Sequence, residues 1–380
     1  MNEHNTVFIG LDTHKVSTDI AYTRPGHKEK PQFFGKIPSQ KKAVIKLLRH
    51  FQSKFPGATL YFVYEAGPCG YWLYRLLSSL DQQCYIVAPS LIPKKPGQRV
   101  KTDKRDSLQL AQLLKNGDIN PLYVPQPEDE AIRDLSRARE RAMHDLNHAR
   151  YQLKALLLRN HIQYTGSANW SAKHLRWLAE LILPYPTQQI VLQEMVQTIN
   201  ERMARLERLS NELTHQVKQW RYYPLIQAIQ AMRGVALVVA AGVIAELGDL
   251  TRFDCPSKLM SYIGVTPGEH STGTRRRLGA ITKAGNSRVR RLLIEGAGSY
   301  RYPAKVSPAM QKRQEALPRA VTDIAWKAQL RLCKRFHYLV KRGKPQNVIK
   351  VSIAREMIAF IWAISREVPL EPAGPVVARK

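Results

Sequence analysis

The spacing of apolar residues changes along the chain, and this change limits the possible folds more than any other feature. Up to about residue 125, short apolar runs alternate with longer amphipathic segments, whereas apolar residues between 128 and 222 recur every seven positions. The first pattern is typical of alternating strands and helices, and the second of long paired helices. The predicted divisions are an α/β domain at 1–125, a helical hairpin or coiled coil at 126–224, a mainly helical domain at 225–368 and a flexible tail at 369–380.

The first of these domains is predicted to contain five strands and three helices. Their order along the chain is β-β-β-α-β-α-β-α, which is the order of an RNase-H-like sheet. The first two strands are close enough in sequence to form a hairpin. The predicted strands are Val7–Leu11, Thr18–Tyr22, Gln32–Lys36, Leu60–Tyr64 and Cys84–Val87, and the helices are Ser39–Lys54, Tyr71–Leu80 and Lys104–Lys115.

Four acidic residues lie at the ends of these predicted elements. Asp12 follows the first strand and Glu65 the fourth, while Asp103 and Asp106 stand one turn apart at the start of the last helix. The first and fourth strands are neighbours in an RNase-H-like sheet and the last helix packs across it, so we expect the four acids to converge. Carboxylates this close repel one another unless cations bind, and hard divalent ions such as Mg²⁺ or Mn²⁺ prefer such oxygen ligands.

Each acid alone is equally typical of a strand-end turn or a helix cap. The set points to a site because basic residues surround Asp103, which a purely structural acidic cap does not require. Those residues are Lys94, Lys95, Arg99, Lys101, Lys104 and Arg105. A pair of metal ions held by the four acids could clamp the attacking and leaving oxygens of a phosphodiester.

The middle segment carries a heptad pattern on two predicted long helices. Leu146 and Leu153 share one register of the first helix, and Leu192, Ile199 and Leu206 recur along the second. This pattern favours a coiled coil that serves as an assembly surface, in a homodimer or homotetramer. The alternative is an ordinary amphipathic helix pair within one protomer.

The charge balance predicts a polyanionic partner. The chain has 59 Lys+Arg against 30 Asp+Glu, for a formal net charge of +29, and nucleic acid is the commonest partner of such a protein. Val235–Ala245, the longest apolar run, is shorter than the ~20 residues that span a bilayer. Four scattered cysteines suit a reducing compartment. With no secretion signal visible, we expect a cytoplasmic protein that is not associated with a membrane.

A segment rich in glycine, threonine and arginine, predicted as a loop, runs from Thr266 to Gly285. Glycines allow close approach of phosphate and arginines grip it, so a hydroxyl held here, that of Ser271, could attack phosphorus. The alternative is that Ser271 only contacts phosphate or caps the loop. The residues predicted to bind nucleic acid are Lys101, Lys104, Arg105, Thr272, Gly273, Arg275, Arg276, Arg277, Lys283, Arg288, Arg290 and Arg291.

Four stretches resemble the DEDD-type transposases of the insertion-sequence-110 family, which are bridge-RNA-guided serine recombinases with a RuvC-like domain. The resemblance covers nearly the whole chain, and its first three motifs together are highly specific. The matching stretches are FIGLDTHK (Phe8–Lys15), YEAGPCGYWLYR (Tyr64–Arg75), VAPSLIPKKPGQRVKTDKRDSLQLAQLL (Val87–Leu114) and YIGVTPGEHSTGTRRRLGAITKAGNSRVRRLLIEGA (Tyr262–Ala297).

The resemblance implies a RuvC/RNase-H-like DEDD domain, a coiled-coil middle and a C-terminal transposase domain. The metal-binding acids of the family fall on Asp12, Glu65, Asp103 and Asp106. It also implies a serine that forms a transient phosphoserine link to DNA, and a structured guide RNA that pairs with donor and target DNA. Many relatives have serine directly before the loop glycine, where this chain has Thr272. Relatives with two successive serines favour Ser271 as the nucleophile, with Thr272 as the alternative.

The predicted function is therefore that of a transposase, which cuts and rejoins DNA strands by phosphodiester transesterification. Two other functions fit parts of the sequence. A RuvC-like endonuclease would use the same acids and a metal-activated water on branched DNA, but it has no use for the glycine–arginine segment. A non-catalytic nucleic-acid-binding protein would use the acids only structurally.

Overall fold

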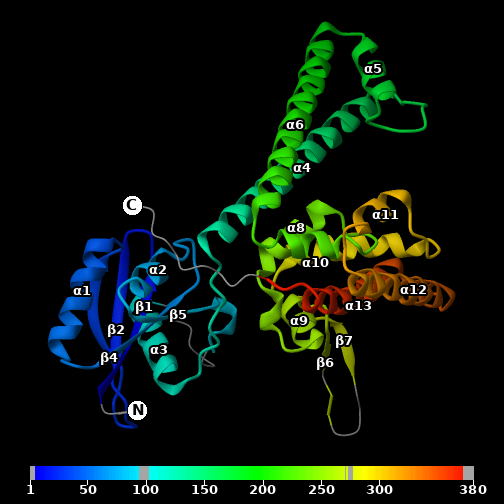
Figure 1. Cartoon of the computed structure of the whole chain (residues 1–380). Helices are drawn as coiled ribbons and strands as arrows, with labels where there is room; N and C mark the ends of the chain where they lie inside the picture. Colours follow the sequence, from blue (N-terminus) through cyan, green and yellow to red (C-terminus); the bar gives the residue numbers. More distant parts are fainter. Residues whose placement is uncertain (1–4, 94–101, 270, 273–276, 371–380) are drawn as a thin grey trace. The chain divides into compact units, whose positions relative to one another are not determined.

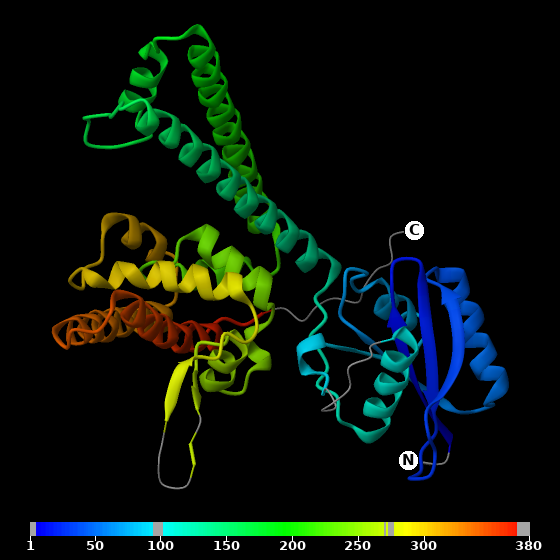
Figure 2. The same cartoon turned by 180° about the vertical axis from the view of Figure 1, so that it is seen from behind.

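The computed structural model describes residues 5–93, 102–269, 271–272 and 277–370. It divides the chain into two compact units, Met1–Val124 and Pro125–Lys380 (Figures 1 and 2). Each unit has its own hydrophobic core. The predicted mixed α/β region followed by a mainly helical region is confirmed.

The first unit holds a five-stranded sheet with the strand order β3-β2-β1-β4-β5. β1 pairs with β2, and β2 with β3, in antiparallel fashion, whereas β1–β4 and β4–β5 are parallel. This element order and sheet are consistent with the predicted RNase-H-like fold. The elements are β1 (Thr6–Thr13), β2 (Ser17–Thr23), β3 (Gln32–Pro38), α1 (Lys41–Lys54), β4 (Thr59–Glu65), α2 (Trp72–Ser78), β5 (Gln83–Val87) and α3 (Asp103–Asn116).

The two faces of this sheet are covered by different helices. Val7, Ile9 and Leu11 of β1 pack in one cluster with residues of α1 and α2. Because side chains alternate along a strand, the residues between them face the other way. The opposite face packs on α3, through a cluster that contains Val63 of β4 and Leu110 of α3.

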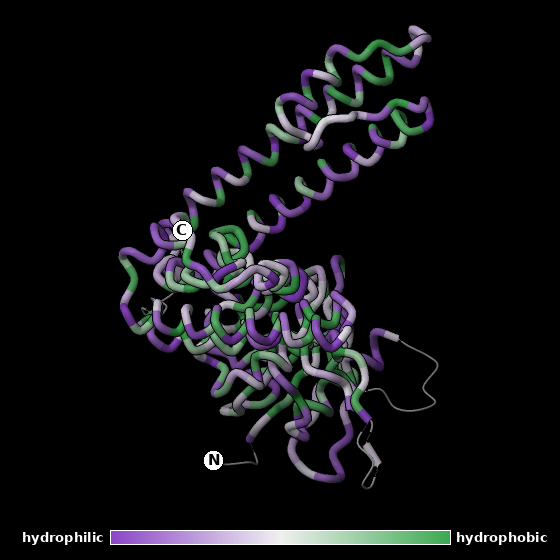
Figure 3. The backbone as a smooth tube through the Cα atoms, turned by 90° about the vertical axis from the view of Figure 1, so that its right-hand side faces the viewer, coloured by the Kyte–Doolittle hydropathy of each residue, from purple (hydrophilic) through white to green (hydrophobic). Residues whose placement is uncertain are grey.

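The second unit begins with a helical hairpin formed by α4 (Pro127–Arg159) and α6 (Pro186–Gln219), with the short α5 (Ala172–Glu180) between them. Heptad residues such as Leu153 and Ile199 are buried in one cluster on these helices. Figure 3 shows hydrophobic residues recurring along both long helices. The heptad pattern is thus satisfied within one chain, and a coiled-coil geometry stays a prediction.

A buried carboxylate links the start of α4 to the residues that follow α6. Asp129, near the start of α4, accepts hydrogen bonds from Trp220 Nε1 at 2.9 Å and from Arg221 Nη2 at 2.5 Å. Both partners follow the end of α6, so Asp129 joins the two ends of the hairpin. A buried charge is tolerated here because it is paired and fully hydrogen-bonded.

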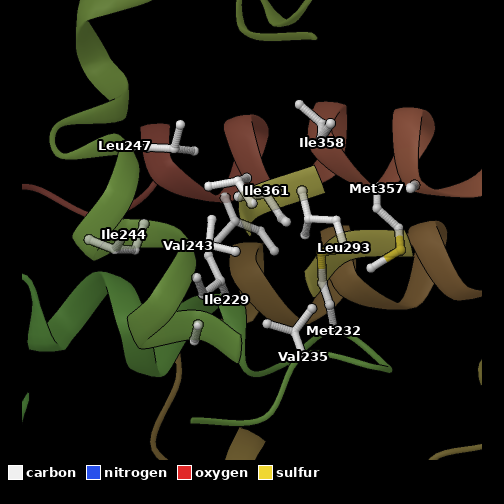
Figure 4. Packing of buried hydrophobic residues seen from close by; sticks show 14 of the residues in the cluster. Ile229, Met232, Val235, Val243, Ile244, Leu247, Leu293, Met357, Ile358 and Ile361 are labelled. Atoms are coloured by element: carbon white, nitrogen blue, oxygen red, sulfur yellow. The ribbon is translucent and has the colours of Figure 1, made fainter. Parts of the chain in front are cut away.

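The remainder of the second unit packs helices around one hydrophobic core. Figure 4 shows Val243 of α8, Leu293 of α10 and Ile361 of α13 meeting in that core. No described helix combines the length and the apolar character needed to cross a membrane. The elements are α7 (Tyr223–Ile229), α8 (Leu237–Leu247), α9 (Pro256–Ile263), β6 (Pro267–Glu269), β7 (Leu278–Ile281), α10 (Ser287–Ala297), α11 (Pro308–Gln314), α12 (Arg319–Lys341) and α13 (Gln346–Arg366).

One prediction about this region is wrong. Part of the expected loop between Thr266 and Gly285 is an antiparallel pair of short strands, β6 and β7, with Glu269 opposite Leu278. We call β6, β7 and the described residues 271–272 and 277 the serine ribbon. The strands are too short and too polar to show the alternation from which a strand is predicted.

Candidate active site

The sheet brings Asp12 and Glu65 to the same edge and the same face. Leu11 of β1 pairs in parallel with Tyr64 of β4, and each of the two acids is the next residue along its strand. Leu11 and Tyr64 belong to the cluster on the α1 and α2 side. The alternation of side chains therefore directs Asp12 and Glu65 to the face that α3 covers.

A close contact at Gly10 positions α3 against β1. A Cβ atom built on Gly10 would lie 2.3 Å from the Ser107 carbonyl oxygen and 2.5 Å from the Ala111 nitrogen. No side chain fits in that space. The backbone of α3 therefore crosses β1 only two residues before Asp12, which places the first turn of α3 beside the acid-bearing edge.

The first turn of α3 supplies the other two acids. Thr102 caps the helix by accepting a hydrogen bond from the Arg105 backbone nitrogen, at 3.4 Å. Asp103 and Asp106 follow in the first turn. Both carboxylates act electrostatically on buried Asp12, so all three lie close together.

His14 joins this cluster, and sequence reasoning missed it. Its Nε2 atom lies 3.3 Å from Asp12 Oδ2 and 3.5 Å from Asp103 Oδ1. Ligand atoms of Asp12, His14 and Asp103 all lie within 4.8 Å of one another, as in a metal site. The signal was available, because His14 lies only two residues after Asp12, just past the end of β1.

The electrostatics of Asp12 fit a cation site. Burial raises the pKa of the Asp12 carboxyl, nearby Asp106 and Asp103 raise it further, and His14 lowers it, with a net increase above the ordinary value. The charged carboxylate is therefore disfavoured without a compensating cation. Hard oxygen donors gathered in this way suit Mg²⁺ or Mn²⁺.

A buried acid and a lysine extend the cluster across the sheet. Asp19 of β2 pairs with Asp12 of β1, and Lys36 of β3 pairs with Asp19. Lys36 Nζ lies 3.2 Å from Asp19 Oδ2 and 3.9 Å from Asp103 Oδ2. A fixed cation thus lies between the buried Asp19 and one of the candidate metal ligands. Sequence reasoning missed this pair because only the cross-strand register brings it to the site.

The serine ribbon belongs to the second unit. The Ser271 hydroxyl donates a hydrogen bond to Glu269 Oε1 at 2.7 Å and accepts one from the Arg277 backbone nitrogen at 3.3 Å. Ser271, Thr272 and Arg277 are all exposed. Among the described residues, the Thr272 side chain makes no comparable hydrogen bond.

The predicted nucleic-acid-binding residues fall into three groups. Lys101, Gly273, Arg275 and Arg276 lie outside the described residues. Exposed positions are occupied by Lys104, Arg105, Thr272, Arg277 and Lys283. Arg288, Arg290 and Arg291, on α10, contact other parts of the protein.

The arginines of α10 hold that helix in place. Arg291 Nη2 lies 2.6 Å from Glu140 Oε1 on α4, and Arg288 pairs with the other oxygen of the same carboxylate. Arg290 donates to the carbonyl of Ile263 at 2.8 Å and also to those of Ala284 and Gly285. These contacts give the three arginines structural roles, and nucleic-acid binding by them stays a prediction.

A buried carboxylate of α8 completes this anchorage. Glu246 accepts hydrogen bonds from Arg137 Nε of α4 at 2.7 Å and from Asn286 Nδ2 at 2.6 Å. Asn286 caps α10, since its side chain also accepts from the Arg288 and Val289 backbone nitrogens. Burial raises the pKa of Glu246, but the hydrogen bonds and charges of Arg137 outweigh it and the pKa lies below its ordinary value.

A basic groove lies on α12 and α13. A hollow of about 850 Å³ is lined by Leu330, Tyr338 and six charged residues. The charged residues are Lys327, Arg331, Lys334, Arg335, Arg355 and Glu356. A second hollow of about 640 Å³ shares Arg331, Arg355 and Glu356 and extends to Thr266, the residue before β6. We call the two hollows together the α12–α13 groove. The groove has an excess of positive charge and reaches the start of the serine ribbon at Thr266. Such a positively charged surface suits the binding of a phosphodiester backbone.

Comparison with known proteins gives the family. Residues 9–162 match a model of the DEDD transposases of IS110 type, and residues 226–315 match the transposase IS116/IS110/IS902 family. The protein y4qE of Sinorhizobium fredii, which is named as a transposase, is 42% identical over 96% of this chain and 90% of its own length.

A second relative extends the comparison to another bacterium. The transposase for insertion sequence element IS1533 of Leptospira borgpetersenii is 29% identical over 89% of this chain and 98% of its own length. The family matches fall on both units, and they include the sheet with its acids and the serine ribbon. The chain therefore belongs to the IS110 family of DEDD transposases.

Proposed function

We propose that this transposase cuts and rejoins DNA by transesterification, with a metal-bound acid site and a serine nucleophile. The observation that carries the proposal is the gathering of acids on the α3 face of the sheet, where burial and neighbouring carboxylates raise the pKa of Asp12. An acid site of this kind has a use in phosphodiester chemistry and none in simple nucleic-acid binding.

In this proposal Asp12, Glu65, Asp103 and Asp106 hold Mg²⁺ or Mn²⁺, with His14 at the rim. When bound, the divalent cation supplies Lewis-acid polarisation of the scissile phosphate. The acids would hold the ion at this edge of the sheet. Lys36 keeps part of their negative charge compensated, through its contacts with Asp19 and Asp103.

Ser271 is the proposed nucleophile, and its hydroxyl oxygen bonds to the phosphorus of one DNA strand. The bond to the leaving sugar oxygen breaks, and its energy is conserved in a phosphoserine link. Attack by a sugar hydroxyl of the exchanged strand then releases Ser271 and rejoins the DNA. Thr272 is the alternative nucleophile, and the Ser271–Glu269 hydrogen bond favours Ser271.

Donor and target DNA are the proposed substrates, and a structured RNA is the proposed guide. The formal net charge of +29 is large enough to attract both. The backbone contacts are assigned to Lys101, Lys104, Arg105, Thr272, Gly273, Arg275, Arg276, Arg277, Lys283, Arg288, Arg290 and Arg291. The working form is proposed to be a homodimer or homotetramer in the bacterial cytoplasm, at the nucleoid.

The decisive experiment looks for a protein–DNA adduct that survives denaturation. The full-length protein, purified with its bound RNA, is incubated with Mg²⁺ and a labelled DNA duplex that carries the end of its insertion element. We expect a slower-migrating labelled protein band on a denaturing gel, absent for Ser271→Ala. DNA cleavage without any adduct would favour a RuvC-like endonuclease that uses water.

The acid site is tested by Asp12→Asn, which keeps the shape of the side chain and removes its charge. We expect loss of the adduct and of Mn²⁺ binding measured by calorimetry, with unchanged affinity for the DNA. An adduct and Mn²⁺ binding at wild-type levels in this variant would exclude Asp12 from the metal site and overturn the metal-dependent mechanism. An adduct that persists in Ser271→Ala but disappears in Thr272→Ala would transfer the nucleophile to Thr272.

A further inference from the structure

The hydroxyl proton of Ser271 has a carboxylate acceptor. Ser271 Oγ lies 2.7 Å from Glu269 Oε1, and the serine is the donor. The oxygen also accepts from the Arg277 backbone nitrogen at 3.3 Å. The sequence pattern alone assigns no role to Glu269.

The pairing of β6 with β7 produces this arrangement. Glu269 is the last residue of β6 and lies opposite Leu278, so the backbone nitrogen of Arg277, one residue earlier on the facing segment, comes close to Ser271. Ser271 lies two residues beyond the end of β6, and its hydroxyl reaches back to the Glu269 carboxylate.

A purely structural role explains this contact poorly. Both side chains are exposed, and an exposed hydrogen bond between side chains adds little to stability because water competes for both groups. The arrangement instead matches that of an activated nucleophile. A weakly acidic hydroxyl lies within hydrogen-bond reach of a base and is open to solvent, where a phosphate can approach.

We propose that Glu269 is the general base that takes the proton of Ser271 during DNA cleavage. The inference rests on the proposed function, since it requires Ser271 to be the nucleophile. As the Oγ–phosphorus bond forms, the hydroxyl proton moves to Glu269 Oε1. The bond from phosphorus to the leaving sugar oxygen breaks, and that oxygen keeps the electron pair and takes a proton from water.

Rejoining runs through the same groups in the opposite direction. The sugar hydroxyl of the incoming strand attacks phosphorus and releases its proton to water. The Ser271 oxygen leaves with the electron pair of the broken bond and recovers the proton held by Glu269. Ser271 and Glu269 thus return to their starting protonation states, with no net consumption of acid or base.

The test compares Glu269→Gln with the wild type in the rate of adduct formation. The glutamine oxygen still accepts a hydrogen bond but is a far weaker base, so we expect the rate to fall roughly 10²–10⁴-fold. Affinity for the same labelled duplex should stay within a factor of about two. Glu207→Gln, an exposed change on α6, is the matched control and should react like the wild type.

A DNA substrate with sulfur in place of the leaving sugar oxygen tests whether Glu269 acts as a base on Ser271 or as an acid on the leaving group. Sulfur leaves without protonation, so a defect in activating the serine persists with this substrate, whereas a defect in protonating the leaving group is rescued. Two substrates are used, with sulfur at the 3′ or at the 5′ bridging position of the scissile phosphate, so that either sugar oxygen can be the leaving atom. We expect Glu269→Gln to remain slow with both, and rescue by either would overturn the assignment.

The remaining outcomes separate this inference from the function on which it rests. An adduct that Glu269→Gln forms at the wild-type rate overturns Glu269 alone and leaves the serine mechanism standing. Absence of any adduct in the wild type overturns the serine nucleophile and the base together. Partial activity in Glu269→Asp, which keeps the carboxylate on a shorter side chain, would support the role of Glu269 as the general base.

Discussion

At the scale of single residues, the acid cluster contains its own cation. Lys36 lies between the buried Asp19 and the partly exposed Asp103, at 3.2 and 3.9 Å. The first contact compensates a charge that would be costly inside the protein, and the second reduces the negative charge available to a metal ion. Lys36 therefore stabilises the fold and weakens metal binding at the same time.

Replacing this lysine should separate the two effects. We expect Lys36→Met to lower the free energy of unfolding by about 1–2 kcal/mol, a value reduced because the lysine is half exposed. Mn²⁺ should bind more tightly to this variant, because less positive charge opposes it. Thermal unfolding and calorimetry measure the two quantities, with Lys36→Arg as the control that preserves both. A variant that binds Mn²⁺ more weakly would contradict this electrostatic account.

At the scale of elements, the anchorage of α10 depends on Glu246. Its carboxylate links α4, through Arg137, to Asn286, the residue that caps α10. Three segments far apart in the sequence thus meet at one buried charge. The helix that follows the serine ribbon is fixed to the hairpin in this way.

Glu246→Gln should lower the free energy of unfolding by about 3 kcal/mol at neutral pH, because it removes the buried carboxylate charge that Arg137 and Asn286 bind. The pKa of Glu246 lies below its ordinary value of 4.5 in the folded protein. The ionised Glu246 carboxylate therefore stabilises the folded protein above the unfolded-state pKa. This stabilisation is lost as the pH falls through the folded-state pKa. Denaturant unfolding between pH 7 and pH 3 should show a smaller acid-induced loss in the variant. An identical pH dependence in both proteins would exclude this role.

The α12–α13 groove gives a second prediction at this scale. Lys327, Lys334 and Arg355 line it, and none of them forms an ion pair with an acid among the described side chains. Changing all three to Gln should weaken DNA binding and reduce the slope of log K against log salt by up to about 3, roughly 0.9 for each phosphate that is no longer neutralised. Binding titrations at several salt concentrations measure the slope. Lys173, Lys218 and Lys312, changed together to Gln, are the control for net charge, and an equal effect in that variant would argue against a specific groove.

The sequence predicted the order of the strands and helices better than the contacts between individual residues. The order of strands and helices in the first unit followed from alternation and length, and the close approach of Asp12 to Asp103 followed from that order. Asp19 and Lys36 were missed because cross-strand register, a tertiary property, brings them to the site. His14 was missed although it lies only two residues after Asp12 in the sequence. The serine ribbon and Glu269 were missed because very short polar strands leave no periodic signal.

At the scale of the whole molecule, the far end of the hairpin exposes apolar residues. Ile182, Tyr185 and Ile190, around the start of α6, are 84%, 65% and 60% exposed. Single exposed apolar residues are ordinary, but a group of them near the start of one helix is typical of a surface that another protein covers. A second copy of this chain is the partner that the proposed dimer or tetramer supplies.

We expect the double change Ile182→Asp and Ile190→Asp to shift the protein towards monomer, since two charges in an apolar contact oppose association. Light scattering during size-exclusion chromatography measures the mass. The same two substitutions made at exposed polar positions of α6, Gln193→Asp and Gln197→Asp, are the control. An unchanged assembly in the apolar variant would exclude the hairpin end as the contact.

The close approach of α3 to β1 has a consequence for related genes. Position 10 offers no ligand, yet even an alanine there would collide with the α3 backbone and push the helix away from Asp12. A copy of the element with all its acids intact but a larger residue at this position should encode an inert enzyme. Surveys that score mobility by counting acidic residues would then include such silent copies, and inspection of this one glycine would remove them.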